Sequence, residues 1–253
     1  MIDSQLRLSQ NQIRTIDDFL VYGTHKAIEA LELMFGLHID NSHSTIEIAS
    51  VRSSHNLHFL MSEDLHIVSS AMSGELNGHI VLLMRSSDYQ SWCNMLRPVL
   101  NLLYLSNADK DLAALDRDKP DWLENGDACL HDESFKAAMT DALHELGNVL
   151  FGIYTRAISS VLHLEAVHSV PRTTLSPDGQ ILMRDTSQVD TMDQMQLIIQ
   201  NDFTVGDTHL KLWCLISPTR ETFEKMLQRI DRPAGGRGDQ HRPSPLSLRC
   251  DPA

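Results

Sequence analysis

The sequence has few of the residues that build metal centres and disulfide frameworks. Its four cysteines lie far apart and form no Cys-x-x-Cys pair: Cys93, Cys129, Cys214 and Cys250. This spacing argues against a zinc site or a disulfide framework and is typical of proteins from a reducing cytosol. We therefore expect a cytoplasmic protein with no metal site of its own.

Long apolar runs and basic clusters are also missing. No run approaches the roughly 20 apolar residues that a membrane-spanning helix needs. The first 30 residues contain four acidic side chains and do not read as a signal peptide. The formal net charge is -13, and Lys and Arg are scattered, so the surface would repel a phosphate backbone. The sequence thus predicts neither membrane insertion nor nucleic-acid binding.

The 253 residues are 42% hydrophobic, which is enough to bury a substantial core. Helical and alternating periodicities divide the chain into elements. Helices are expected at 10–37, 87–105, 134–164 and 219–230, and strands at 44–51, 65–72, 79–84, 194–204 and 208–217. Gly36 is placed to cap the first helix, and Pro98 is a point where the second could break. This pattern favours an α+β fold.

The elements follow the same order twice. Residues from about 10–105 and 134–230 each read as a long helix, then strands, then a helix, which suggests an internal duplication within a single domain of residues 1–230. The connection at 106–133 is strongly acidic. The segment 231–253 is rich in Pro, Gly, Ser and Arg, and we predict that it is a disordered tail.

The helix expected at 134–164 has two contrasting sides on a helical wheel. One side is apolar and is predicted to be buried: Leu143, Leu146, Leu150, Ile153, Ala157 and Val161. The opposite side is polar or small: Asp141, Glu145, Asn148, Gly152, Thr155 and Ser159. Gly152, Thr155 and Ser159 would leave a shallow surface beside Glu145 and Asn148 on which a macromolecule could dock. By spacing alone, the polar side also fits an ordinary solvated face.

The spacing Asp141-x3-Glu145-x2-Asn148-x22-Pro171 resembles the signature of the CheC, CheX and FliY family of response-regulator phosphatases. The run from Glu145 to Asn148, Glu-Leu-Gly-Asn, resembles that family's helix. The glycine-punctuated segment 72–84 resembles its central hairpin. The resemblance covers roughly residues 10–230, although outside the helix it is one of pattern.

The resemblance implies an α+β fold with long helices packed on an antiparallel sheet. It also implies hydrolysis of the phospho-aspartate of a CheY-like receiver, in chemotaxis or another two-component pathway. In such an enzyme Asn148 would orient the attacking water, and Glu145 would dock against the receiver's active-site lysine. Asp141 would support the pair, and Pro171 would fix the chain path after the helix. Mg²⁺ is expected on the receiver partner, with no cofactor bound by this chain.

The first half departs from the family pattern because its long helix lacks a Glu-x2-Asn pair. Aligning Ala30 with Ala157 puts Asp18 and Val21 at the active positions. Aligning the two Leu-His-apolar runs, residues 37–39 and 162–164, instead puts Leu20 and Gly23 there. Either way the first half is predicted to be degenerate. The alternative function is a non-catalytic module that docks on a receiver or a flagellar-switch protein. The sequence names neither the receiver, the pathway nor the oligomeric state.

Overall fold

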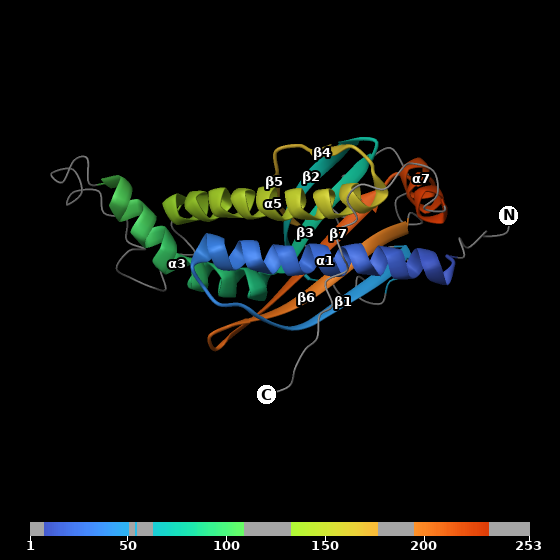
Figure 1. Cartoon of the computed structure of the whole chain (residues 1–253). Coiled ribbons are helices and arrows are strands. Elements are labelled where there is room, and N and C mark those ends of the chain that lie inside the picture. Colours follow the sequence, from blue (N-terminus) through green and yellow to red (C-terminus); the bar gives the residue numbers. More distant parts are fainter. Residues whose placement is uncertain (1–7, 51–53, 55–62, 109–132, 177–194, 233–253) are drawn as a thin grey trace, which may run out of the picture.

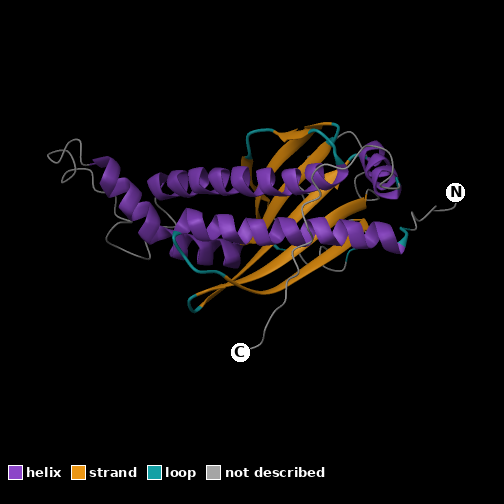
Figure 2. Ribbon diagram, in the orientation of Figure 1, coloured by secondary structure: helices purple, strands orange, loops and turns teal. Residues whose placement is uncertain are grey.

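The structure is a computed structural model that describes residues 8–50, 54, 63–108, 133–176 and 195–232. In these ranges, helices pack on an antiparallel sheet, with the two longest helices side by side across it (Figures 1 and 2). The helices are α1 (Gln10–Phe35), α3 (Ser86–Ala108), α5 (Glu133–Leu162) and α7 (Arg220–Asp231). The predicted α+β class is confirmed.

Seven strands form one sheet in the described part of the chain. They are β1 (Asp40–Ser50), β2 (Leu65–Gly74), β3 (Gly78–Arg85), β4 (Ala166–His168), β5 (Arg172–Ser176), β6 (Met195–Val205) and β7 (Thr208–Pro218). Their order is β1-β6-β7-β3-β2-β4, and β5 also pairs with β2. Hairpins β2–β3 and β6–β7 meet at the β3–β7 pair. The outer strand β6 pairs with β1, which follows α1, and the outer strand β2 pairs with β4 and β5, which follow α5. The order is therefore symmetric about the β3–β7 pair. This symmetry fits the proposed duplication.

Three features differ from the sequence predictions. Helix α3 continues through Pro98 to Ala108, so the helix does not break there and it includes the start of the acidic connection. Strands β4 and β5 were not predicted, because they are only three and five residues long and lie on either side of Pro171. The rest of the acidic connection and the chain from residue 233 lie outside the described residues. The tail was predicted to begin at residue 231, but Asp231 belongs to α7.

Both long helices end on a residue with left-handed backbone conformation. Helix α1 begins with a capping box, in which Ser9 Oγ accepts from the Gln12 N–H at 3.2 Å and Gln12 Oε1 accepts from the Ser9 N–H at 2.8 Å. It ends at Gly36, with φ of 63°. Helix α5 is followed by His163, with φ of 52°. The predicted cap at Gly36 is confirmed, and the matching ends provide a register between the two halves.

Helix α5 is fixed against α1 by a close crossing at Gly23. A Cβ atom at Gly23 would lie 2.8 Å from Tyr154 Cδ1, so only glycine allows this approach. Tyr154 is fully buried, and its hydroxyl lies 3.2 Å from Thr24 Oγ1. Burial raises the pKa of the Tyr154 phenol far above its usual range. This anchor sets the rotation of α5 and thereby decides which of its side chains face solvent.

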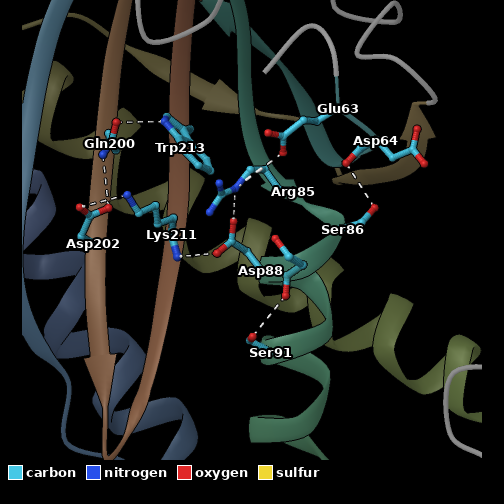
Figure 3. A network of polar contacts seen from close by, with 11 residues as sticks. Glu63, Asp64, Arg85, Ser86, Asp88, Ser91, Gln200, Asp202, Lys211 and Trp213 are labelled. Atoms are coloured by element: carbon cyan, nitrogen blue, oxygen red, sulfur yellow. Dashed lines mark hydrogen bonds and ion pairs between the residues drawn. The ribbon is translucent and has the colours of Figure 1, made fainter. Parts of the chain in front are cut away.

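A polar network fixes the start of α3 on the sheet (Figure 3). Arg85 Nε donates to Asp88 Oδ2 at 2.6 Å, and the guanidinium carbon lies 5.5 Å from the ring centre of Trp213. Asp88 is buried, and its other oxygen accepts from the backbone N–H of Lys211 at 3.3 Å. Because Asp88 bonds to both β3 and β7, α3 cannot shift along the sheet without leaving a buried carboxylate unpaired.

The stacked ring of His66 makes stability depend on pH. His66 on β2 stacks on Tyr89 of α3 with ring centroids 3.6 Å apart, and burial lowers the His66 pKa from 6.5 to about 4. An unfolded histidine takes up its proton near pH 6.5 and the folded one only near pH 4, so this group lowers the free energy of unfolding as pH falls through that window. Replacing His66 by Phe keeps a ring and removes the proton. We expect urea midpoints of the variant to fall less between about pH 7 and about pH 5. An equally steep fall in both proteins would contradict this.

Candidate functional site

The exposed part of α5 carries the acidic and amide side chains that the sequence singled out. Asp141, Glu145 and Asn148 are all exposed, and spacings of four and three residues place them on one side of the helix. Within the described residues, no side-chain hydrogen bond or ion pair engages any of the three. Two carboxylates and one amide are therefore available to a partner on one short stretch of helix.

Pro171 packs against the helix between Glu145 and Asn148. A Cβ atom at Gly147 would lie 2.8 Å from Val68 Cγ1 and 3.3 Å from Pro171 Cβ. Two segments thus pack closely against α5 at Gly147: strand β2, and the residues between β4 and β5. Pro171 itself is buried. Through this contact Pro171 helps to fix the turn of α5 that carries Glu145 and Asn148.

Alanine substitutions at the two glycines of this helix are expected to differ in their effect on stability. Alanine is favoured over glycine inside a helix by about 1 kcal/mol. At Gly152 the nearest atom to an added Cβ is His168 Nε2 at 3.5 Å, so Gly152→Ala should gain most of that amount. At Gly147 the added Cβ overlaps Val68, and overpacking costs roughly 1–3 kcal/mol, so Gly147→Ala should be neutral to destabilising. Urea unfolding of both variants measures this, and equal gains would show that Gly147 is not tightly packed.

The C-terminal part of the same helix side is covered, which corrects the predicted docking surface. Thr155 is only 4% exposed, and the Oγ of Ser159 is buried. Gly152 is partly exposed, beside His168. Strand β4 packs against α5 and places the His168 ring edge-on to Phe151, with 6.1 Å between the ring centroids. Thr155 and Ser159 therefore do not belong to an open docking surface.

The buried stripe of α5 also differs at its end from the prediction. Leu143, Leu146, Leu150 and Ala157 are buried as predicted, and Ile153 is partly buried. Val161, by contrast, is exposed. It lies in the last turn of α5, close to the helix end at Leu162. In the last turns Ile158 and Leu162 face the core instead, so the buried side of α5 is shifted by one residue from the predicted stripe.

The ends of the two long helices decide between the two alignments of the first half. Superposing Gly36 on His163 pairs Asp18 with Glu145 and Val21 with Asn148. This is the alignment that also matches Ala30 with Ala157. Val21 is exposed at the position of the amide, but its side chain cannot donate or accept a hydrogen bond. The first half therefore lacks the amide of the second.

Sequence reasoning missed three residues that pack at or near this site: Gly147, Val68 and His168. Gly147 was visible as part of the Glu-Leu-Gly-Asn run, and a mid-helix glycine signals a close approach because it otherwise costs about 1 kcal/mol. Val68 and His168 gave no such signal. Their roles depend on which strands pack against α5, and that is a property of the whole fold.

The described part of the chain shows neither a metal centre nor a membrane-spanning helix. No group of three or more His, Cys, Asp or Glu side chains in these ranges is arranged to hold a metal ion. None of the helices in the same ranges is both long enough and apolar enough to cross a bilayer. The groups that the exposed face offers are carboxylates and an amide.

Known proteins share parts of this sequence. No model of a known protein family matches the chain. A curated relative, the CheY-P phosphatase CheC of Bacillus subtilis, is 26% identical over 106 residues. The match covers 40% of this chain and 50% of CheC, so it spans about half of that relative's length.

Solved structures share the whole fold. FliY of Thermotoga maritima has a TM-score of 0.55 and 14% identity, and the match covers 89% of this chain and 98% of FliY. The middle domain of FliM from H. pylori has a TM-score of 0.50 and 12% identity, covering 88% of this chain and 99% of that domain. At these identities the likeness is one of fold. The chain thus resembles CheC in sequence over part of its length and FliY in fold.

The chain has one half in which the Glu-x2-Asn pair is present and exposed. The other half has Asp18 and Val21 at the corresponding places. The resemblance to the family that the sequence indicated is confirmed, and so is the expected fold. The roles of individual residues remain to be proposed from the geometry.

Proposed function

We propose that this CheC-like protein hydrolyses the phospho-aspartate of a CheY-like receiver with the exposed face of α5. One observation carries the proposal. Glu145 and Asn148 are both exposed and unpaired within the described residues, one turn apart, beside the contact of Gly147 with Pro171. The sequence match to the CheY-P phosphatase CheC of Bacillus subtilis supports it.

The proposed chemistry needs a positioned water and no covalent enzyme intermediate. The water oxygen attacks phosphorus in line with the bond to the aspartyl oxygen. That bond breaks, its electron pair stays on the receiver's carboxylate, and the water's proton leaves to a phosphate oxygen or to solvent. The Asn148 amide carries an acceptor oxygen and two N–H donors, so it can hold such a water in the attacking orientation. Mg²⁺ would be held by the receiver's carboxylates, which are oxygen ligands of the kind it prefers.

Glu145 would dock the receiver through a cationic side chain, most simply the lysine of the phosphorylation site. Asp141 lies one turn before Glu145 on the same exposed side and adds a second negative charge. Two neighbouring carboxylates attract a cation more strongly than one, particularly once the contact excludes water. Asp141 is therefore proposed to support the docking of Glu145, with no part in the attack itself.

The direct experiment follows the decay of a phosphorylated receiver with increasing amounts of the purified chain. Under the proposal the rate constant of phosphate loss rises with added chain and then saturates. A receiver that lacks the phosphorylatable aspartate serves as the control for phosphate release from other sources. Binding of the phosphorylated receiver without any rise in the decay rate would reject the enzyme and select the second candidate.

That second candidate is a non-catalytic module that docks on a receiver or a flagellar-switch protein. The observation that favours it is the fold shared with FliM. A FliM of H. pylori, solved as a complex with FliG, has a TM-score of 0.51 and 9% identity to this chain. The first half, in which Val21 takes the place of the amide, also suits a docking role. Both candidates place the protein with its partner in the cytoplasm.

A further inference from the structure

Three apolar side chains are exposed along the β4–β5 edge of the sheet. Val167 is 64% exposed, Val170 is 80% exposed and Leu175 is 55% exposed. Pro171 lies within this segment and contacts α5 at Gly147. Exposed apolar side chains mark a protein-binding surface only where they gather on one side, so the face on which each of them lies matters.

The strand register shows which of these side chains share a side with the exposed residues of α5. Val68 contacts α5 at Gly147, and Val68 pairs with Thr173 while His66 pairs with Leu175. Because directly paired residues point to the same face of a sheet, Thr173 and Leu175 face the helix layer.

Val167 points the other way. His168 packs on Phe151 of α5, and it pairs with Met72, a residue of the core beneath the helices. Val167 is the neighbour of His168 in the strand and pairs with Ser73. Successive side chains of a strand alternate between the faces, so Val167 faces away from α5. The edge thus offers a matched pair, with Leu175 on the helix side and Val167 on the opposite side.

A receiver docked on Asn148 would lie close to this edge, because Pro171 packs on the neighbouring Gly147. Leu175 lies four residues beyond Pro171, which is about 13 Å along the strand at 3.3 Å per residue. Val170 directly precedes Pro171. A typical protein–protein interface buries about 800 Å² on each partner, which corresponds to a disc of about 16 Å radius. A disc of that size centred on Asn148 extends past Pro171, which packs on the neighbouring Gly147, to Val170 and toward Leu175.

We propose that Val170 and Leu175 form the apolar part of the surface that docks the receiver. This inference rests on the proposed function and specifies how the partner is held. Glu145 fixes the orientation of the receiver through a charge pair, while Val170 and Leu175 meet an apolar patch beside its phosphorylation site. The receiver's affinity then depends on both contacts, whereas the attack on phosphorus depends on Asn148.

The test compares Leu175→Asp and Val170→Asp with the control Val167→Asp. Binding is measured to a receiver held in its active form by beryllium fluoride, and the unfolding midpoint of each variant confirms that it folds. We expect affinity to fall about tenfold or more at Leu175 and Val170 and to stay near the wild-type value at Val167. The control Val167→Asp should also dephosphorylate the receiver at the wild-type rate.

Three results would overturn this inference. One is wild-type affinity in both Leu175→Asp and Val170→Asp, and another is an equal loss at Val167. The third is a wild-type chain that dimerises at the assay concentration and dissociates on Leu175→Asp, because the edge would then be a contact between copies. Failure of the proposed function is seen separately. In that case the wild-type chain would not accelerate phosphate loss, whatever the affinities.

Discussion

An Asn148→Ala variant is expected to lose about 100-fold in the rate constant of receiver dephosphorylation while keeping its affinity within about twofold. Asn148 is exposed and unpaired in the described structure, so its removal leaves no buried group without a partner and should not disturb the fold. Its proposed task is the orientation of water in the transition state, and a loss confined to that step lowers the rate without weakening binding. Single-turnover decay at saturating chain, together with a binding titration, measures both quantities.

Asn94 provides a matched control for this variant. It is also an exposed asparagine within a helix, but it lies on α3. Asn94→Ala should therefore dephosphorylate the receiver at the wild-type rate. If Asn148→Ala were as fast as Asn94→Ala, the amide would have no part in the reaction. The proposed mechanism would then have to be abandoned.

Charge reversal at Glu145 should weaken receiver binding far more than charge reversal elsewhere on the long helices. Loss of one partner of a desolvated charge pair costs about 2–5 kcal/mol, which is roughly 30-fold to several thousand-fold in affinity. Glu29 on α1 forms an exposed ion pair with Lys26 at 2.6 Å, and such pairs contribute about 0–1 kcal/mol. Affinities of Glu145→Lys and Glu29→Lys, measured at two salt concentrations, test the difference.

Glu32 is not a suitable control in that comparison. Its Oε1 accepts from the backbone N–H of Ile39 at 2.9 Å and lies 2.7 Å from His38 Nδ1. The hydrogen bond from Ile39, followed by that from His38, lowers the pKa of Glu32. A lysine at position 32 would remove these hydrogen bonds and destabilise the chain after α1. A loss of affinity would then not distinguish misfolding from a lost charge contact. Equal losses of affinity at Glu145 and Glu29 would mean that diffuse negative charge attracts the receiver, and the assignment of the site would be wrong.

The fold was predictable where the sequence pattern is long and local. Helices α1 and α5 extend over many turns of apolar periodicity, and Gly36 marks the end of α1, so their bounds were predicted to within two residues. Strands β6 and β7 are eleven residues each and are separated by a glycine turn. Strands β4 and β5 escaped prediction because they are short, and pairing with β2 of the other half stabilises them.

The exposed residues of the candidate site were predictable because they lie close together in one helix, whereas the contacts made by other segments were not. Helical spacing alone places Asp141, Glu145 and Asn148 on one side of α5, and the structure exposes all three. The same spacing wrongly extended the open surface to Thr155, since a helical wheel cannot show which other segments pack against the helix. The packing of Pro171 on Gly147 likewise depends on contacts between distant segments.

The most direct test of the account compares the two long helices in one assay. The decay rate of a phosphorylated receiver is measured at saturating chain for Glu145→Gln/Asn148→Ala and for the matching change in the first half, Asp18→Asn/Val21→Ala. The account predicts that the α5 variant leaves the receiver decaying at its spontaneous rate, while the α1 variant remains as fast as wild type. An equal effect of both pairs, or no effect of the α5 pair, would contradict the claim that this face of α5 performs the hydrolysis.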